Sequence, residues 1–84
     1  NSQGTTITLT FQMDDEPGIL SDVLKIIAEY RANILTIHQS IPINGKGLLT
    51  VSVDIEDSET DVSAMIQDVE KIEDVSYVKI IAME

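Results

Sequence analysis

The sequence contains no cysteine and no tryptophan, and only five of its 84 residues are lysine or arginine. Without cysteine the chain has neither a disulfide framework nor a thiolate metal site, and this is compatible with a reducing compartment. Fifteen acidic residues against five basic ones give a formal net charge of −10. Because nucleic acids and anionic membranes attract basic surfaces, we expect neither of them as a partner.

Long apolar runs and a signal peptide are also missing from the sequence, so no membrane-spanning segment is predicted. With 43% hydrophobic and 24% charged residues, the composition is typical of a globular domain. We expect a single small cytoplasmic domain over residues 5–84, with a modest core that self-association would help to stabilise. The first four residues, Asn1 to Gly4, are expected to be a linker or a cloning remnant, which would make the chain a piece of a longer protein.

A strand gives way to a helix near the N-terminus. Side chains alternate between apolar and polar over about residues 5–13 and predict a half-buried strand, and apolar residues at helical spacing then predict a helix over about 18–31. Between them, Pro17 suits a helix start, and Gly18 permits a tight turn and close approach of the backbone. The free amides at this start form a small anion-accepting site, although a plain strand-to-helix turn explains the same residues.

The remaining elements follow from the same kinds of pattern. The sequence predicts, in order, a strand over 34–41 ending at Pro42, a hairpin turn at Asn44-Gly45-Lys46-Gly47, a strand over 48–55, a helix starting within 58–61, and, after Asp74, a strand over 75–83. This β-α-β-β-α-β order predicts an α+β fold, the ferredoxin-like sandwich, with a four-stranded antiparallel sheet and both helices on one face.

One face of the predicted sheet would meet the helices. We expect the core to contain Val23, Leu24, Ile27, Val62, Ile66 and Val69 packed on Leu9, Phe11, Leu35, Ile37, Val51 and Val53. The other face would carry Thr6, Thr8, Thr10, Thr36, His38, Ser40, Thr50 and Ser52, and would meet solvent or a second layer from a missing domain. His38, the only histidine, makes neither a metal site nor a catalytic pair by itself, and we expect it to be packed, hydrogen-bonded or part of an interface.

The stretch Asp15-Glu16-Pro17-Gly18-Ile19-Leu20, a helix ending in Ala32-Asn33-Ile34, and the β-α-β-β-α-β order together resemble the ACT domain, a regulatory module that binds amino acids. The stretch from Asn33 to Ile43 is similar to the C-terminal half of small bacterial ACT proteins often labelled PheB-type chorismate mutase. The resemblance implies that copies pair side by side, as a homodimer or higher oligomer. An amino acid, such as phenylalanine, would lie between the strand-to-helix loop of one copy and the surface of the next.

The resemblance also implies a set of ligand-binding residues: Asp14, Asp15, Pro17, Gly18, Ile19, Leu20, Asn33 and Ile34. Among these, the backbone amides of residues 18–20 would meet the carboxylate of the ligand. Asp14 or Asp15 would meet its ammonium group, although a carboxylate at this position also serves as a partner of the helix dipole. The side-chain amide of Asn33 would bond either the ligand or the loop.

No catalytic residue, metal or cofactor is predicted for this segment. The chorismate mutase reaction needs cations and hydrogen-bond donors around a dianionic substrate. The cations here are scattered along the sequence: Lys25, Arg31, Lys46, Lys71 and Lys79. No nucleophile–base pair or phosphate loop is present either. We favour a regulatory module, and two alternatives stay open: part of a chorismate mutase of aromatic amino-acid biosynthesis, or a dimerisation module without a ligand.

Overall fold

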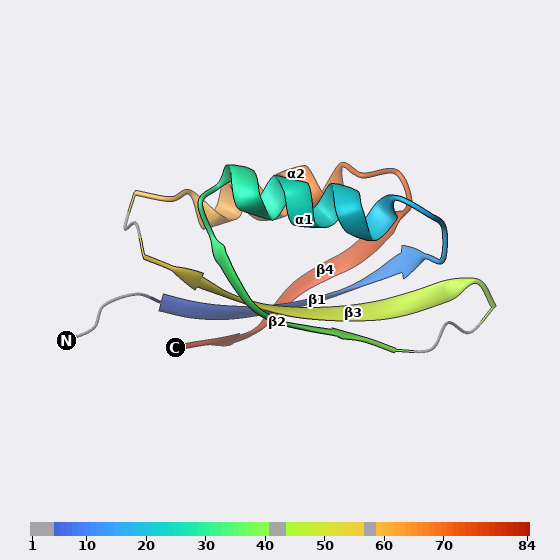
Figure 1. Cartoon of the computed structure of the whole chain (residues 1–84), viewed down its shortest axis with the longest axis horizontal. Coiled ribbons are helices and arrows are strands. Elements are labelled where there is room, and N and C mark those ends of the chain that lie inside the picture. Colours follow the sequence, from blue (N-terminus) through green and yellow to red (C-terminus); the bar gives the residue numbers. More distant parts are fainter. Residues whose placement is uncertain (1–4, 41–43, 57–58) are drawn as a thin grey trace.

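The computed structural model describes residues 5–40, 44–56 and 59–84. Its elements are β1 (Thr5–Asp14), α1 (Ile19–Glu29), β2 (Asn33–Gln39), β3 (Lys46–Ile55), α2 (Val62–Glu70) and β4 (Val75–Met83). The strands form one antiparallel sheet in the order β2-β3-β1-β4, and both helices cover the same face of it (Figure 1). The predicted ferredoxin-like sandwich is confirmed. The predictions for Asn1–Gly4, for Ile41–Ile43 and for Ser58 lie outside the described residues.

The core lies between the helices and the two central strands. β1 and β3 pair without interruption from Thr5 opposite Ile55 to Asp14 opposite Lys46, so their apolar residues alternate in step and face the helices together. The buried residues are Ile7, Leu9, Phe11, Met13, Ile19, Val23, Ile27, Ala32, Leu49, Val51, Val53, Ile55, Met65, Val69 and Val75. Leu24, Val62 and Ile66, which the sequence placed in the core, are only half-buried. Ile19, Val23 and Ile27 are the buried residues of α1, and Met65 and Val69 are those of α2.

The edge strand β2 differs from its prediction. The prediction that Leu35 and Ile37 lie in the core is wrong, since these side chains are 49% and 44% exposed. The pairing of β2 with β3 shifts between Ile34 and Thr36, and this irregularity leaves Leu35 out of the alternation. Ile34 packs against the core instead. Ile37 stands opposite the buried Val51, but an edge strand has a neighbour on one side only, so it stays half open to solvent.

Helix α1 ends at Glu29, two residues before its predicted end at about residue 31. Arg31 takes a left-handed conformation with φ of 65°, its amide donates to the carbonyl of Ala28 at 2.9 Å, and the amide of Ala32 donates to the carbonyl of Ile27 at 3.4 Å. This pair of bonds is a Schellman motif, which satisfies the last carbonyls of the helix. The predicted Asn44–Gly45 turn is confirmed, since both residues have positive φ.

A hydrogen bond joins the two helices. The hydroxyl of Tyr30, at the end of α1, donates to the carboxylate of Asp68 on α2. This hydrogen bond raises the pKa of Tyr30 and lowers the pKa of Asp68. At the start of α2, the side chain of Asp61 accepts from the amide of Ala64 at 3.0 Å and caps the helix. Neither described helix has the length and apolar character needed to cross a membrane.

Candidate functional site

The loop between β1 and α1 opens directly onto the first turn of the helix. Gly18 precedes α1 with φ of 93°, a conformation that side-chain-bearing residues rarely adopt. No side chain caps this helix start, and an added Cβ at Gly18 would have no atom within 4 Å. The local sequence explains the geometry, because Pro17 cannot donate a hydrogen bond and Gly18 alone accepts the turn without strain. The helix start is therefore open to an approaching group.

The amides at this start are largely unused. The amide of Ile19 lies 3.5 Å from the carbonyl of Glu16, which is a long hydrogen bond. Of the backbone hydrogen bonds in the described part of the chain, none is donated by Gly18 or Leu20. The first amides of a helix carry a partial positive charge and point outward along its axis. The start of α1 at residues 18–20 thus offers backbone amides with little competition from the rest of the chain.

Three carboxylates gather beside the same loop. Ligand atoms of Asp14, Glu16 and Asp74 lie within 4.8 Å of one another. The ammonium group of Lys46 binds the carboxylate of Asp14, and this hydrogen bond lowers the pKa of Asp14 and raises the pKa of Lys46. Partial burial, followed by the hydrogen bond to Asp14 and the charge of Glu16, raises the pKa of Asp74. The cluster carries more negative charge than Lys46 balances, so it attracts a further cationic group.

The predicted ligand-binding set left out Glu16 and Asp74 of this cluster and Lys46 beside it. Glu16 was named only as part of the stretch 15–20, Asp74 only as the residue before the last strand, and Lys46 as part of a hairpin turn and as one of the scattered cations. The amide of Asp14 donates to the carbonyl of Asp74 at 2.9 Å, which holds the start of β4 against the end of β1. Lys46 reaches Asp14 because the two residues are paired across β1 and β3. The contact of Lys46 could have been predicted only from the register of β1 against β3. No pattern in the sequence around Asp74 predicts that it lies beside Asp14.

The structure does not bring all of the predicted site residues together within one copy. Asp14 is paired with Lys46 at one end of β3, whereas Asn33 is paired with Asp54 near the other end. Eight residues of strand separate these two positions, which corresponds to roughly 27 Å. Residues 14–20 therefore form one group, and Asn33 and Ile34 form another at the opposite end of the sheet.

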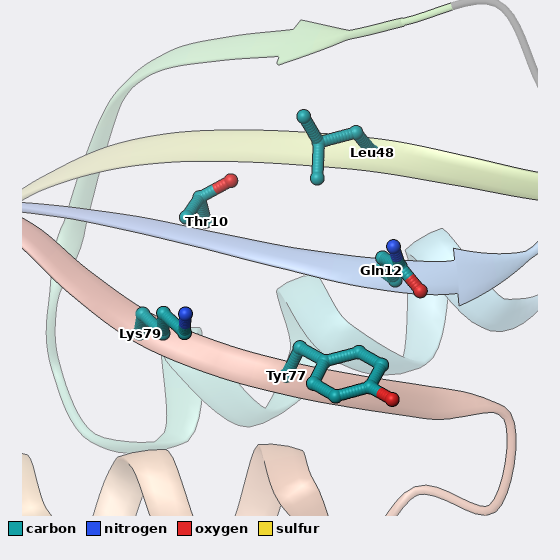
Figure 2. Close-up of a pocket in the computed structure, with 5 residues that line it drawn as sticks. All are labelled: Thr10, Gln12, Leu48, Tyr77 and Lys79. Carbon is teal, nitrogen blue, oxygen red and sulfur yellow. The ribbon is translucent and has the colours of Figure 1, made fainter.

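A second concave surface lies on the face of the sheet away from the helices. Thr10, Gln12, Leu48, Tyr77 and Lys79 line a shallow hollow of about 450 Å³ there (Figure 2). Around it, the predicted hydroxyl face is present: Thr8 and Ser52 are hydrogen-bonded across the strands at 3.0 Å, as are Thr50 and Thr10 at 3.4 Å.

His38 lies opposite Thr50 on the edge strand of this face. The prediction that it is packed or hydrogen-bonded is wrong, because it is exposed and has no hydrogen-bond partner in the described part of the chain. An edge strand again leaves a side chain without a neighbour on its outer side.

The cations do not converge on either surface. Lys25 lies on α1, Arg31 follows α1, Lys46 starts β3, Lys71 follows α2 and Lys79 lies on β4. Among the described residues, Lys46 forms an ion pair with Asp14 and Lys71 forms one with Asp68. Lys46 is the cation paired with a carboxylate at the loop, and Lys79 is the cation that lines the hollow.

Comparison with known proteins identifies the same fold and one family of relatives. A family model of the ACT domain matches residues 7–74. A "UPF0735 ACT domain-containing protein" of Lachnoclostridium phytofermentans is 45% identical over 84 residues, which is all of this chain and 58% of the relative. A protein of the same name from Caldicellulosiruptor saccharolyticus is 40% identical over 84 residues, 56% of its length. The chain thus spans little more than half the length of these relatives, whose names state no ligand or activity.

Solved structures extend the likeness to the fold. The ACT domain of the GTP pyrophosphokinase of Chlorobium tepidum superposes with a TM-score of 0.76 at 14% identity, covering 94% of this chain and all of that one. A homoserine dehydrogenase of Thiobacillus denitrificans gives a TM-score of 0.77 at 23% identity, covering 93% of this chain and 17% of the enzyme. At these identities, the likeness establishes the shared fold and nothing about ligands.

Proposed function

Since the chain belongs to the ACT domain family, we propose that it is a non-catalytic regulatory module that binds a small amino acid. The observation that carries this proposal is the uncapped start of α1 next to a carboxylate cluster. We further propose that the domain over residues 5–84 works in the cytoplasm as part of a longer protein, as the greater length of its relatives suggests.

The head group of an α-amino acid suits the loop between β1 and α1. Its carboxylate would accept hydrogen bonds from the free amides of Gly18 and Leu20, where the helix dipole favours an anion. Its ammonium group would meet the surplus negative charge of Asp14, Glu16 and Asp74. Asp15 is exposed next to this cluster and offers one more acceptor, while Asp14 is already bound to Lys46. A zwitterion therefore finds a partner for each of its charges within one loop.

Asn33 and Ile34 would join this site only through a second copy of the chain. The Gln39 end of β2 lies at the loop end of the sheet, since Gln39 pairs with Leu49 while Met13 pairs with Gly47. If two copies pair their β2 edges about a two-fold axis, the strands run antiparallel, and Asn33 of one copy lies beside Gln39 of the other. We propose this homodimer as the binding unit. In this dimer, the start of α1 in each copy would face Asn33 and Ile34 of the other copy.

The identity of the amino acid rests on the resemblance alone. Similarity of the stretch from Asn33 to the PheB-type proteins favours an aromatic amino acid such as phenylalanine. The names of the relatives at 40–45% identity neither support nor oppose this choice. We therefore propose phenylalanine as the first ligand to test, followed by the other amino acids in a thermal-shift screen, because a ligand that binds only the folded state raises its melting temperature.

Calorimetric titration of phenylalanine into three variants tests the site. Gly18→Val is expected to abolish binding, because its side chain would fill the open space over the helix start. Gly45→Val is the control for backbone strain, since Gly45 also has positive φ and an open Cβ direction. The variant keeps the carbonyl that accepts from the amide of Asp15 and does not cover the helix start. Asn33→Ala is expected to weaken binding about 5- to 30-fold, which corresponds to a loss of about 1–2 kcal/mol from one or two hydrogen bonds.

The same titration separates regulation from the chorismate mutase alternative. Arg31 follows α1, away from the loop, so Arg31→Ala is expected to leave amino-acid binding unchanged. Tight binding of chorismate that is lost in Arg31→Ala would overturn the regulatory proposal. Equal loss of phenylalanine binding in Gly18→Val and Gly45→Val would show that strain, and not the covered helix start, is responsible.

A further inference from the structure

Strand β4 contains a bulge at Tyr77, a residue type that rarely adopts the backbone conformation found there. Thr10 pairs with Lys79 and Gln12 pairs with Ser76, so two residues of β4, Tyr77 and Val78, stand opposite the single residue between Thr10 and Gln12. Tyr77 has φ of 58°, in the left-handed region that normally favours glycine. A bulky side chain in this region is a backbone outlier, and it persists only where the surrounding structure enforces it.

The bulge decides which side chains of β4 reach the open face of the sheet. Val75 is buried under the helices, so an unbroken alternation would turn Tyr77 and Lys79 toward the helices as well. With the bulge, Val78 packs against the core instead. Tyr77 and Lys79 are both turned to the open face, where they line the hollow with residues from β1 and β3 (Figure 2). A strained residue thus places an aromatic ring and a cation on one surface.

The chemistry of the hollow is divided between apolar and polar groups. Tyr77 and Leu48 are 71% and 45% exposed, which leaves two apolar surfaces open to solvent. Between them in the sheet, β1 contributes the hydroxyl of Thr10 and the side-chain amide of Gln12 (Figure 2). Lys79 adds a cation, and it has no ion pair in the described part of this acidic chain.

The hydroxyl of Thr10 has one hydroxyl neighbour across the strands. The hydroxyl of Thr50 on β3 lies 3.4 Å from the hydroxyl of Thr10, which is a long hydrogen bond, so the hydroxyl of Thr10 can still donate to another group. The hydroxyl of Thr10, the side-chain amide of Gln12 and the ammonium group of Lys79 are thus three hydrogen-bond donors in the lining of the hollow. Charged and neutral donors around one point favour an anionic oxygen group, above all a carboxylate.

We propose that this hollow is a second binding site, which takes a small carboxylate bearing a planar apolar group. The ring of the ligand would lie against Tyr77 and Leu48, and its carboxylate would meet Lys79, Thr10 and Gln12. A volume of about 450 Å³ is in the range of small-molecule sites. The site lies on the sheet face opposite the helices, so it is distinct from the loop at the start of α1 and does not depend on the function proposed for that loop (Figures 1 and 2).

Amide chemical-shift mapping of the 84-residue chain with phenylacetate tests this proposal. We expect saturable shifts at residues 10, 12, 48 and 77–79, and none with the neutral analogue phenylacetamide, because the carboxylate is needed for Lys79. Lys79→Gln is expected to weaken phenylacetate binding at least tenfold. Lys25→Gln is the matched control, since it removes the same charge from an exposed position of α1 on the other side of the sheet, and it should leave binding unchanged.

Tyr77→Gly separates a binding role from a structural one. Glycine accepts the left-handed conformation without strain, so this variant should keep or raise the melting temperature while losing phenylacetate binding. Phenylacetate binding that persists in Tyr77→Gly would mean that the ring has no binding role, whatever happens to the melting temperature.

Three other results would overturn the proposal. They are equal shifts with phenylacetamide, shifts that persist in Lys79→Gln, and shifts confined to residues 14–20. The last result would leave the loop site intact while excluding the hollow. A different result, obtained without any phenylacetate, is that the amide signals of the residues of the hollow broaden as the protein concentration rises. That result would assign this face to contact with a second copy.

Discussion

Replacing Phe11 by alanine is expected to remove a large share of the stability of this domain. Phe11 is 1% exposed, faces the helices from the central strand β1, and heads the fully buried side chains by volume. Truncation of a buried phenylalanine costs about 3–5 kcal/mol, because the lost transfer energy is joined by the energy of the cavity left behind. A chain of 84 residues has a total stability of roughly 4–13 kcal/mol. We therefore expect the melting temperature to fall by more than about 10 °C.

Urea unfolding followed by far-UV circular dichroism measures this change directly, and Leu35→Ala provides the control. The sequence pattern places Leu35 in the core beside Phe11, whereas the structure leaves it 49% exposed on the edge strand. At a concentration where the chain is monomeric, Leu35→Ala should cost less than about 1 kcal/mol. If Leu35→Ala destabilised the monomer as much as Phe11→Ala, the irregular pairing of β2 and the core described here would be wrong.

Two further predictions concern self-association and pH. The exposed apolar side chains of β2 predict a dimer in sedimentation at protein concentrations on the order of tens of micromolar. Ile37→Lys should shift the dimer to the monomer, because lysine on an edge strand opposes pairing. A monomeric wild-type protein would contradict this prediction. The hydrogen bond from Tyr30 lowers the pKa of Asp68, so the folded state binds fewer protons than the unfolded state below about pH 4, and stability falls as the pH drops through that range. Tyr30→Phe should therefore lose less of its melting temperature between pH 5 and pH 3 than the wild type, and an equal loss in both proteins would exclude this contact as a source of acid sensitivity.

The sequence predicts the central strands well and the edge strands poorly. β1 and β3 each have neighbours on both sides, so their alternation must match the pairing along its whole length, and the apolar pattern from Leu9 to Phe11 maps directly onto the core. Edge strands tolerate an inserted residue, because only one neighbour constrains them. The pairing irregularities at Leu35 and at Tyr77 change which face of the sheet these side chains lie on, compared with a simple alternation along the strand. No local pattern marks either position, since neither is glycine.

The candidate loop shows the same division between local and distant information. Pro17 and Gly18 determine the turn and the open helix start by their own backbone preferences, so these features follow from a short stretch of sequence. Asp74 comes from 60 residues further along the chain and reaches the loop only because β4 pairs with β1. The predicted contribution of Asn33 depends on a second copy of the chain, which a single sequence specifies only through the apolar edge of β2.

The charge of the chain separates what its two candidate sites would accept. A net charge of −10 repels small anions from the surface as a whole, so a carboxylate binds only where local groups outweigh that repulsion. At the loop, the amides of residues 18–20 stand beside Asp14, Glu16 and Asp74, and a ligand without an ammonium group would face these carboxylates uncompensated. In the hollow, Lys79 stands without a paired carboxylate among the described residues, so an ammonium group on the ligand would bring no gain. The loop should therefore prefer a zwitterion and the hollow a simple anion, which makes the two sites chemically distinguishable within one small domain.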